Sequence, residues 1–314
     1  MTHNAERSHM RCVEMYVLVI LASACALAQP KVTKIEKLSL GSSQVWGSPR
    51  FSPDGKSVYF TTENYDGIWE YSLGTKTSQQ ITGDRGAGFG FRIGQDGNSI
   101  AYRRTQVDPT THLRTGEVVL VDRHKGAAAV LGAGRDISLP SFAGTSVVFS
   151  STEGIVHQPS GVLSCPIAVL GIEKTKIAVY RDGQKILLDP LKGGSYIWPS
   201  LSPDGQWILA YDMDRGTFIC STYGTVRSML GRKDSPAWTR DGRWVIFSDE
   251  KDDGYRIISS HLGWISVDGG TGGLLTEADS LVALTPSCSP VENKIVFSTI
   301  SGGVYVIDYE EEGQ

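Results

Sequence analysis

A short segment that recurs along the chain constrains its fold more than any other feature. The segment PRFSPDGKSVYF at residues 49–60 returns as PSLSPDGQWILA at residues 199–210 and as PAWTRDGRWVIF at residues 236–247. Asp-Gly supplies the positive-φ positions of a tight turn, and the apolar stretches on either side are typical of half-buried strands. Each copy therefore predicts a two-stranded antiparallel hairpin. Weaker copies begin at residues 89, 140 and 286.

More strands follow each hairpin. A polar tip leads to a third strand with alternating apolar residues, as at residues 68–73 and 304–308, and a short fourth strand follows, as at residues 79–82. Four antiparallel strands in each repeat are typical of a propeller blade. The six repeats begin about 47 residues apart on average, close to propeller repeat lengths. The sequence predicts an all-β, six-bladed β-propeller of four-stranded antiparallel blades, with five or seven blades as the alternatives.

The last repeat supplies only three strands before the chain reaches its acidic end. Residues 32–38 are the one strand-like segment left over, so we expect them to be the outer strand of the last blade. That pairing would close the ring with an N-terminal strand and remove an exposed sheet edge. Glycine, with 36 of 314 residues, is well above its usual share and fits the many turns of this fold.

The repeat also resembles that of a known family. The blocks FSPDG (51–55), LSPDG (201–205) and WTRDG (238–242), each followed by an aliphatic strand, resemble the WD40-like Pro-Asp-Gly repeat of TolB-like β-propellers. The resemblance covers nearly the whole chain after Ala28, and it implies a fold rather than a task. In TolB an α/β domain of well over a hundred residues precedes the propeller. Only about twenty residues separate Ala28 from Pro49, so we expect the propeller alone, and a role in the Tol-Pal system does not carry over.

The first residues predict export. Residues 16–28 form an apolar run of 13 residues, too short to span a bilayer, and it ends in the small-x-small pattern Ala26-Leu27-Ala28. We expect residues 1–28 to be a signal peptide cleaved after Ala28, and residues 29–314 to be a periplasmic or extracellular propeller with no transmembrane span. The segment ending at Cys25 resembles a lipobox, so a lipoprotein is the alternative.

The net charge and the cysteine content argue against two functions, nucleic-acid binding and a cysteine metal site. The net charge of −4 argues against a nucleic-acid-binding protein, which needs a basic surface. Beyond Ala28 the chain carries Cys165, Cys220 and Cys288, which allow at most one disulfide and match no metal-site spacing. We expect a monomer that binds another protein or a peptide.

The motifs of catalysis and cofactor binding are missing from the sequence. There is no Gly-x-Ser-x-Gly elbow, and no phosphate-binding or dinucleotide-binding glycine pattern stands in a suitable context. The histidines after residue 28 are isolated, so we expect no metal site. The acidic tips at residues 212–214 and 249–254 are expected to be solvated hairpin ends, with calcium loops as the alternative.

Two arginines break the pattern of the first strands. Aligning the repeat starts puts Arg50 among small residues, and two positions further it puts Arg92 among small residues again. Small side chains are expected where strands crowd a central axis. We therefore expect Arg50 and Arg92 to project into the axial channel or its mouth and to bind an anion. The alternative is that one or both of them pair with a buried carboxylate of a neighbouring blade.

Three further residues complete the predicted axial binding site. Trp46 and Trp198 stand just before two repeat starts, near one end of the axis, where they would either pack or stack on a ligand. His157 lies in an excursion of the long third repeat, at residues 140–199, where extra loop length suits a binding surface.

These observations favour a non-catalytic, exported propeller that binds a protein or peptide in the bacterial cell envelope. The alternative is a carbohydrate-active enzyme, a lyase or a hydrolase, with its site at the axial mouth. Pectate-cleaving lyases resemble this repeat as well, and they hold a metal through clustered histidines, whereas the histidines of this chain are scattered.

Overall fold

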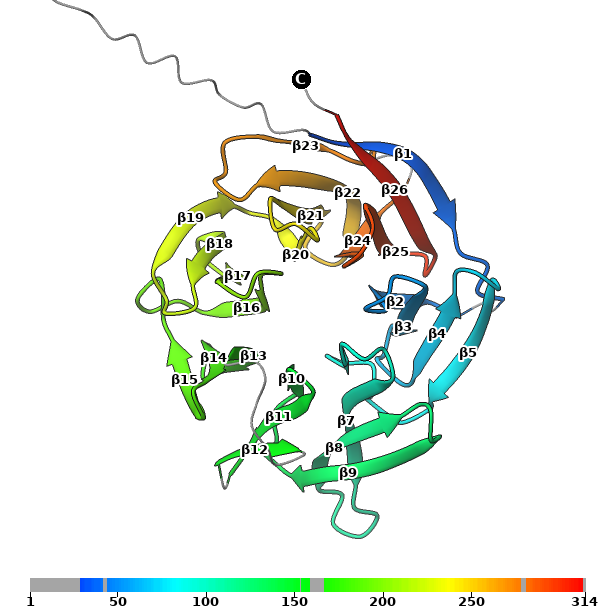
Figure 1. The fold of residues 1–314 in the computed structure, drawn as a ribbon, viewed down its shortest axis with the longest axis vertical. Coiled ribbons are helices and arrows are strands. Elements are labelled where there is room, and N and C mark those ends of the chain that lie inside the picture. The colour runs from blue at the N-terminus through cyan, green and yellow to red at the C-terminus, as the bar shows by residue number, and fades with distance from the viewer. Residues whose placement is uncertain (1–28, 42–43, 153, 159–166, 278–280, 313–314) are drawn as a thin grey trace, which may run out of the picture.

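The structure is a computed structural model that describes residues 29–41, 44–152, 154–158, 167–277 and 281–312. These residues form 26 strands and no helix, and so include no helix long and apolar enough to cross a membrane. The strands make seven antiparallel sheets that stand around a ring as propeller blades (Figure 1). The chain is an all-β, seven-bladed β-propeller, and the prediction of six blades is wrong.

Five blades have four strands each, ordered from the innermost strand outward. Blade 1 has β2 (Trp46–Phe51), β3 (Ser57–Thr62), β4 (Ile68–Ser72) and β5 (Thr77–Thr82). Blade 2 has β6 (Arg92–Ile93), β7 (Ser99–Val107), β8 (Arg114–Asp122) and β9 (Ala127–Gly134). Blade 5 has β16 (Tyr196–Leu201), β17 (Trp207–Asp212), β18 (Gly216–Ser221) and β19 (Val226–Gly231). Blade 6 has β20 (Asp234–Trp238), β21 (Trp244–Asp252), β22 (Ile257–Ser266) and β23 (Gly272–Leu274). Blade 7 has β24 (Ala283–Cys288), β25 (Lys294–Thr299), β26 (Val304–Glu312) and β1 (Gln29–Lys37).

The seventh blade comes from the long third repeat, which contains two three-stranded blades. Blade 3 has β10 (Ser141–Ala143), β11 (Ser146–Ser151) and β12 (Gly154–Gln158), and blade 4 has β13 (Ile167–Glu173), β14 (Lys176–Arg181) and β15 (Gln184–Leu188). The first hairpin of blade 4 turns at Lys174 and Thr175, both in the left-handed region, instead of at Asp-Gly. Counting repeats by Pro-aromatic and Asp-Gly signatures therefore passes over this blade.

Blade 4 runs in the opposite direction to blade 5. The Tyr196 amide, at the start of β16, donates a 3.0 Å hydrogen bond to the Thr175 carbonyl in the β13–β14 turn. The first turn of blade 4 thus lies at the face where blade 5 begins. Because blade 3 has three strands, its last strand ends at the face opposite to the one where its first strand began. The three strands of blade 4 bring the chain back to the face where blade 5 begins.

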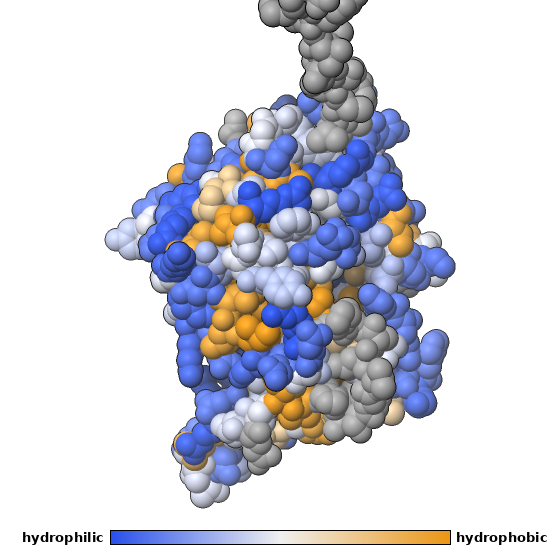
Figure 2. All heavy atoms as spheres, turned by 60° about the vertical axis from the view of Figure 1, so that its left-hand side comes forward, coloured by the Kyte–Doolittle hydropathy of each residue, from blue (hydrophilic) through white to orange (hydrophobic). Residues whose placement is uncertain are grey.

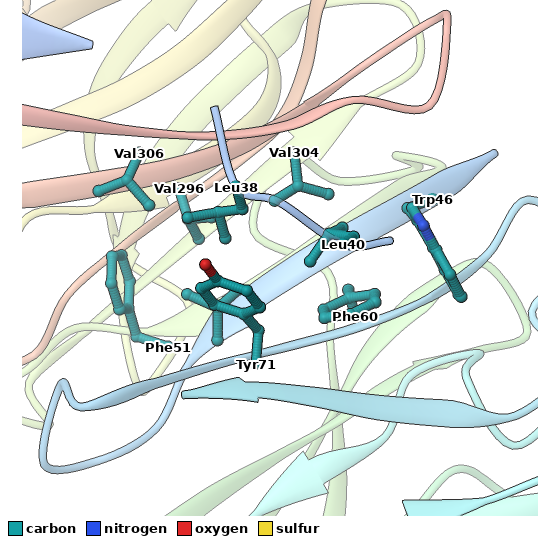
Figure 3. Close-up of a cluster of buried hydrophobic side chains, with 10 residues drawn as sticks. Leu38, Leu40, Trp46, Phe51, Phe60, Tyr71, Val296, Val304 and Val306 are labelled. Carbon is teal, nitrogen blue, oxygen red and sulfur yellow. The ribbon is translucent and has the colours of Figure 1, made fainter. Parts of the chain in front are cut away.

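The expected closure of the ring by an N-terminal strand is confirmed. Strand β1 pairs antiparallel with β26, so that Gln29 lies opposite Glu312 and Lys37 opposite Tyr305. The chain then passes from β1 into the junction between blades 7 and 1, where Leu38 and Leu40 are buried against apolar side chains of both blades (Figure 3). The seam is thus held by backbone pairing and by a shared core.

A recurring hydrogen-bond pattern explains the Ser/Thr-x-Asp-Gly signature. In blade 5 the buried Ser202 hydroxyl donates to Asp204 Oδ1 over 2.5 Å and accepts from the Trp207 amide over 2.9 Å. The Asp204 carboxylate also accepts from the Gln206 amide at 3.0 Å, which fixes the turn. Blades 1 and 6 repeat the pattern with Ser52–Asp54 and Thr239–Asp241.

We predict that Ser202→Ala destabilises the protein by about 1–2 kcal/mol, because the Trp207 amide and the Asp204 carboxylate each lose a partner. Urea denaturation monitored by fluorescence measures the change. The exposed strand residue Ser78 provides the control, and Ser78→Ala should change stability by less than about 0.5 kcal/mol. Equal losses for the two variants would contradict this role of Ser202.

Candidate functional site

Because the strands of each blade are antiparallel, successive loops lie on alternate faces of the ring. First strands of the four-stranded blades run away from one face, which we call the upper face, and second strands return to it. The upper face carries the starts of β2, β16, β20 and β24 and the turns between second and third strands. The lower face carries the turns between first and second strands, including those with Asp-Gly, and between third and fourth strands.

Arg50 and Arg92 occupy the same position in neighbouring blades. Arg50 lies opposite Tyr59 and Arg92 lies opposite Ala101, each the third residue of the second strand. Sequence alignment put Arg92 two residues further along, level with Ser52. The two-residue error arises because blade 2 has no proline at its start to mark where the first strand begins. Four other innermost strands carry small, uncharged residues at this position: Ser141, Ser200, Ala237 and Ser287.

The two guanidinium groups converge on one backbone oxygen. Nη1 of Arg50 and Nη1 of Arg92 each donate to the Phe91 carbonyl over 3.2 Å, and Arg92 also donates to the Gly90 carbonyl at 3.3 Å. The Arg50 guanidinium stands over the Phe91 ring, 5.2 Å from its centroid. Both side chains are half-buried on innermost strands, which surround the centre of the ring (Figure 1).

No carboxylate neutralises this pair within the described part of the chain: no Asp or Glu oxygen there lies within 4.0 Å of either guanidinium. Burial and the neighbouring charge of Arg92 lower the pKa of Arg50 to about 9, and burial lowers the pKa of Arg92. Both groups remain protonated at neutral pH. The arrangement is therefore a half-buried double positive charge.

Trp198 lies at a strained position on the upper side of β16. Its φ is 52°, and a β-bulge interrupts the pairing between Ile197 and Ser200. A bulky residue in the left-handed region is an outlier. The same position, two residues before the ring position of Arg50, also has positive φ in four other blades, where it is held by Ser48, Gly90, Ser235 and Thr285. Trp198 is 43% exposed and packs edge-on against Tyr211.

Trp46 and His157 differ from Trp198. Trp46 is 5% exposed and packs edge-on against Phe60 and Trp69. With Phe60 it belongs to the buried cluster in the junction between blades 7 and 1 (Figure 3). It packs in the core rather than facing solvent. His157 belongs to strand β12, but its side chain is not among those described. Of the predicted site residues, the structure brings Arg50 and Arg92 together and exposes Trp198.

Further aromatic residues are exposed on the upper face, and sequence reasoning did not single them out. Tyr65, in the β3–β4 turn, packs edge-on against Phe89 with ring centroids 5.1 Å apart. Tyr255 is fully exposed at the β21–β22 hairpin tip. With Trp198 these make four of the five exposed aromatic side chains among the described residues, and Tyr223, in the β18–β19 turn, lies on the lower face. The outer surface differs: Figure 2 shows hydrophobic patches among hydrophilic residues on the side of the molecule that it draws. Val226 and Met229 of β19 are exposed.

The lower face has a polar cleft of about 350 Å³ between blades 1 and 2. At its floor the buried Glu70 carboxylate accepts hydrogen bonds from Tyr59 at 3.1 Å and from Gln79 at 2.6 Å, and it forms an ion pair with Arg123. Arg123 also donates to the Tyr59 hydroxyl at 2.6 Å. Arg123 belongs to blade 2 and Glu70 to blade 1, so the network ties the blades together and leaves Glu70 fully engaged.

The acidic tips, expected to be solvated hairpin ends with calcium loops as the alternative, have carboxylates that accept hydrogen bonds from backbone amides. Asp212 is buried and accepts from the Ser195 and Arg215 amides at 3.0 and 2.9 Å. Asp253 accepts from the amides of Tyr255 and Arg256, and these hydrogen bonds, the one from Arg256 foremost, lower its pKa. Across the described residues, no three His, Cys, Asp or Glu side chains are grouped to hold a metal ion.

Two of the cysteines carry free thiols. Cys220 is buried in β18, and burial raises its pKa to about 12; Cys288 is half-buried in β24, and burial raises its pKa as well. Cys165, Cys25 and the predicted signal peptide lie outside the described residues.

Comparison with known proteins supports the fold. No protein-family model and no curated protein matches the sequence. Among solved structures, the β-propeller domain of Myceliophteria thermophila Cps50 (Swd1) is similar with a TM-score of 0.59 and 12% identity, over 89% of this chain and 99% of that chain. TolB from Acinetobacter baumannii gives 0.47 and 16%, covering 88% of this chain but only 57% of TolB. Oligogalacturonate lyase from Vibrio parahaemolyticus gives 0.47 and 12%, over 83% and 76% of the two chains.

We predict opposite sensitivities for the two tryptophans. Trp46→Ala should destabilise the protein by about 3–5 kcal/mol, because it empties a buried, well-packed site. Trp198→Asn should leave stability within about 1 kcal/mol of the original, since asparagine tolerates the left-handed region and little packing is lost. Chemical denaturation of both variants measures this. A loss above about 3 kcal/mol for Trp198→Asn would show that Trp198 is a core residue.

Proposed function

We propose that this chain is an exported, non-catalytic binding module of the bacterial cell envelope, which docks a protein or peptide partner on its upper face. The observation that carries the proposal is the concentration of exposed aromatic side chains there. Four of the five among the described residues lie on that face: Tyr65, Phe89, Trp198 and Tyr255. Exposed tyrosine and tryptophan side chains are the usual anchors of protein interfaces, because they bury much area for little lost entropy.

The chemistry of the residues near the axis favours binding over catalysis. Arginine stays protonated and binds anions, and aromatic rings offer apolar area, so neither moves protons at neutral pH. Glu70, the buried carboxylate of the lower-face cleft, is already held by Arg123, Tyr59 and Gln79. The carbohydrate-active alternative predicts release of unsaturated products from polygalacturonate, or of reducing ends from neutral polysaccharides. We expect neither from the purified protein.

We predict that Tyr65→Ser and Phe89→Ser, combined, abolish capture of the partner. The two rings form one exposed pair, so their removal deletes about two anchors, or a loss on the order of 100-fold in affinity. Quantitative mass spectrometry after cross-linking in intact cells measures the capture.

Tyr223→Ser is the matched control, because this tyrosine is 72% exposed on the lower face. It should capture the same partner as the unchanged protein. A partner retained by the Tyr65/Phe89 variant but lost with Tyr223→Ser would place the interface on the wrong face of the ring and refute the proposal.

Export gives a second test. We predict that the mature protein begins at Gln29, because the apolar run ends in Ala26-Leu27-Ala28. Intact-mass measurement of the protein from the periplasm or medium should show this N-terminus, and Ala28→Lys should block cleavage. A mature chain that begins at a lipid-modified Cys25 would support the lipoprotein alternative, and a full-length cytoplasmic chain would refute export.

A further inference from the structure

The arginine pair on the innermost strands of the ring places two like charges side by side. Arg50 and Arg92 stand at one position of neighbouring innermost strands, where four other blades have serine or alanine. Their Nη1 atoms each lie 3.2 Å from the same oxygen, so they are at most about 6.4 Å apart. Like charges at that distance repel, more strongly in a half-buried site than in water.

Neutral backbone carbonyls cannot compensate the charge of two cations. Each guanidinium has five N–H donors, and the hydrogen bonds to the Phe91 and Gly90 carbonyls engage only Nη1 of each. The edge formed by Nε and Nη2 carries none of these hydrogen bonds, and it can pair with both oxygens of a carboxylate. Arg104 provides a contrast within the same protein, because its guanidinium forms ion pairs with Asp84 at 3.2 Å and with Glu117 at 2.7 Å.

We propose that Arg50 and Arg92 form an anion site that binds a carboxylate of an acidic peptide segment at the innermost strands of the ring. This rests on the proposed function, and it names the chemistry of the partner. A carboxylate between the guanidinium groups removes their repulsion and forms bidentate, charge-assisted hydrogen bonds. Burial, and after it the neighbouring charge of Arg92, lowers the pKa of Arg50 to about 9, which agrees with a cation that has no carboxylate beside it.

The surroundings favour a polypeptide over an acidic sugar. The exposed aromatic residues of the upper face stand at three separate places around the ring: the boundary of blades 1 and 2, blade 5 and blade 6. A polypeptide can reach all three while one acidic side chain contacts the arginine pair. A short oligosaccharide would need stacking platforms grouped beside the charge.

The first test separates a binding role from a structural one by the sign of a stability change. Arg50→Gln removes one of two repelling charges, so without added anions it should raise the thermal midpoint by a few degrees. A structural arginine would lower it. Arg103 is the matched control: it donates to the Ile137 carbonyl at 2.9 Å across the boundary of blades 2 and 3. Arg103→Gln should lower the midpoint, and an equal fall for Arg50→Gln would overturn the proposal.

The second test measures binding directly by isothermal titration of the whole protein with hexaglutamate. Hexaglutamate should bind and hexaglutamine should not, and Arg50→Gln with Arg92→Gln should weaken hexaglutamate binding by at least about 100-fold. Arg103→Gln should leave the affinity unchanged. Absence of hexaglutamate binding, or equal binding to the double variant, would overturn the proposal.

Two further ligands identify the source of the anion. Trigalacturonate binding more tightly than hexaglutamate would overturn the peptide assignment in favour of an acidic sugar, and sulfate binding as tightly as hexaglutamate would reduce the site to a small-ion site. The Tyr65/Phe89 variant keeps the two proposals distinguishable. If it still captures the partner while hexaglutamate binding depends on the arginines, the upper-face interface fails and the anion site stands.

Discussion

The antiparallel pairing of β1 with β26 is the interaction on which the rest of the structure depends. Each blade is a small sheet whose apolar faces are covered only by its two neighbours, so a ring left open would expose one face at each end. The pairing joins the two ends of the chain, from Gln29 opposite Glu312 to Lys37 opposite Tyr305. Leu38 and Leu40, directly after β1, then fill the seam between blades 7 and 1. A closed ring fixes the innermost strands around one axis and sets Arg50 and Arg92 on neighbouring strands.

Closure also sets a rule for the number of strands. A chain that must enter each blade at the same face needs an even number of strands in every blade, and blades 3 and 4 have three each. Blades 3 and 4 together have six strands, an even number, and blade 4 runs in the opposite direction to blade 5. Two short, adjacent blades are thus mutually dependent: either one alone would leave the chain at the wrong face for β16.

Much of this architecture follows from sequence. The repeats predicted the all-β propeller, and the strand count of the last repeat predicted an N-terminal closing strand at residues 32–38, close to the observed Gln29–Lys37. The predicted number of blades was wrong because the prediction counted copies of the Pro-aromatic and Asp-Gly motif rather than strands. Blade 4 turns through Lys174 and Thr175, whose left-handed φ values no residue preference would indicate. Only part of the candidate site could be predicted from the sequence. An arginine among small residues is easy to recognise, whereas Tyr65 and Phe89 cannot be told from buried strand aromatics until the turn that exposes them is known.

Six of the seven innermost strands share the ring position of Arg50. Where one of these strands carries an unusual residue, that residue raises the free energy of the folded protein. Arg50 and Arg92 put two cations without a described carboxylate partner where serine or alanine suffices elsewhere, and Trp198 puts an indole at a left-handed bulge that elsewhere holds glycine or a hydroxyl residue. Each of these choices disfavours the free folded state, through repulsion in one case and backbone strain in the other. Packing alone would select the small residues found in the other blades. A bound acidic segment of the kind we propose would offset the repulsion of the arginines, and a contact with Trp198 would offset the strain, so one ligand would account for both departures from the repeat.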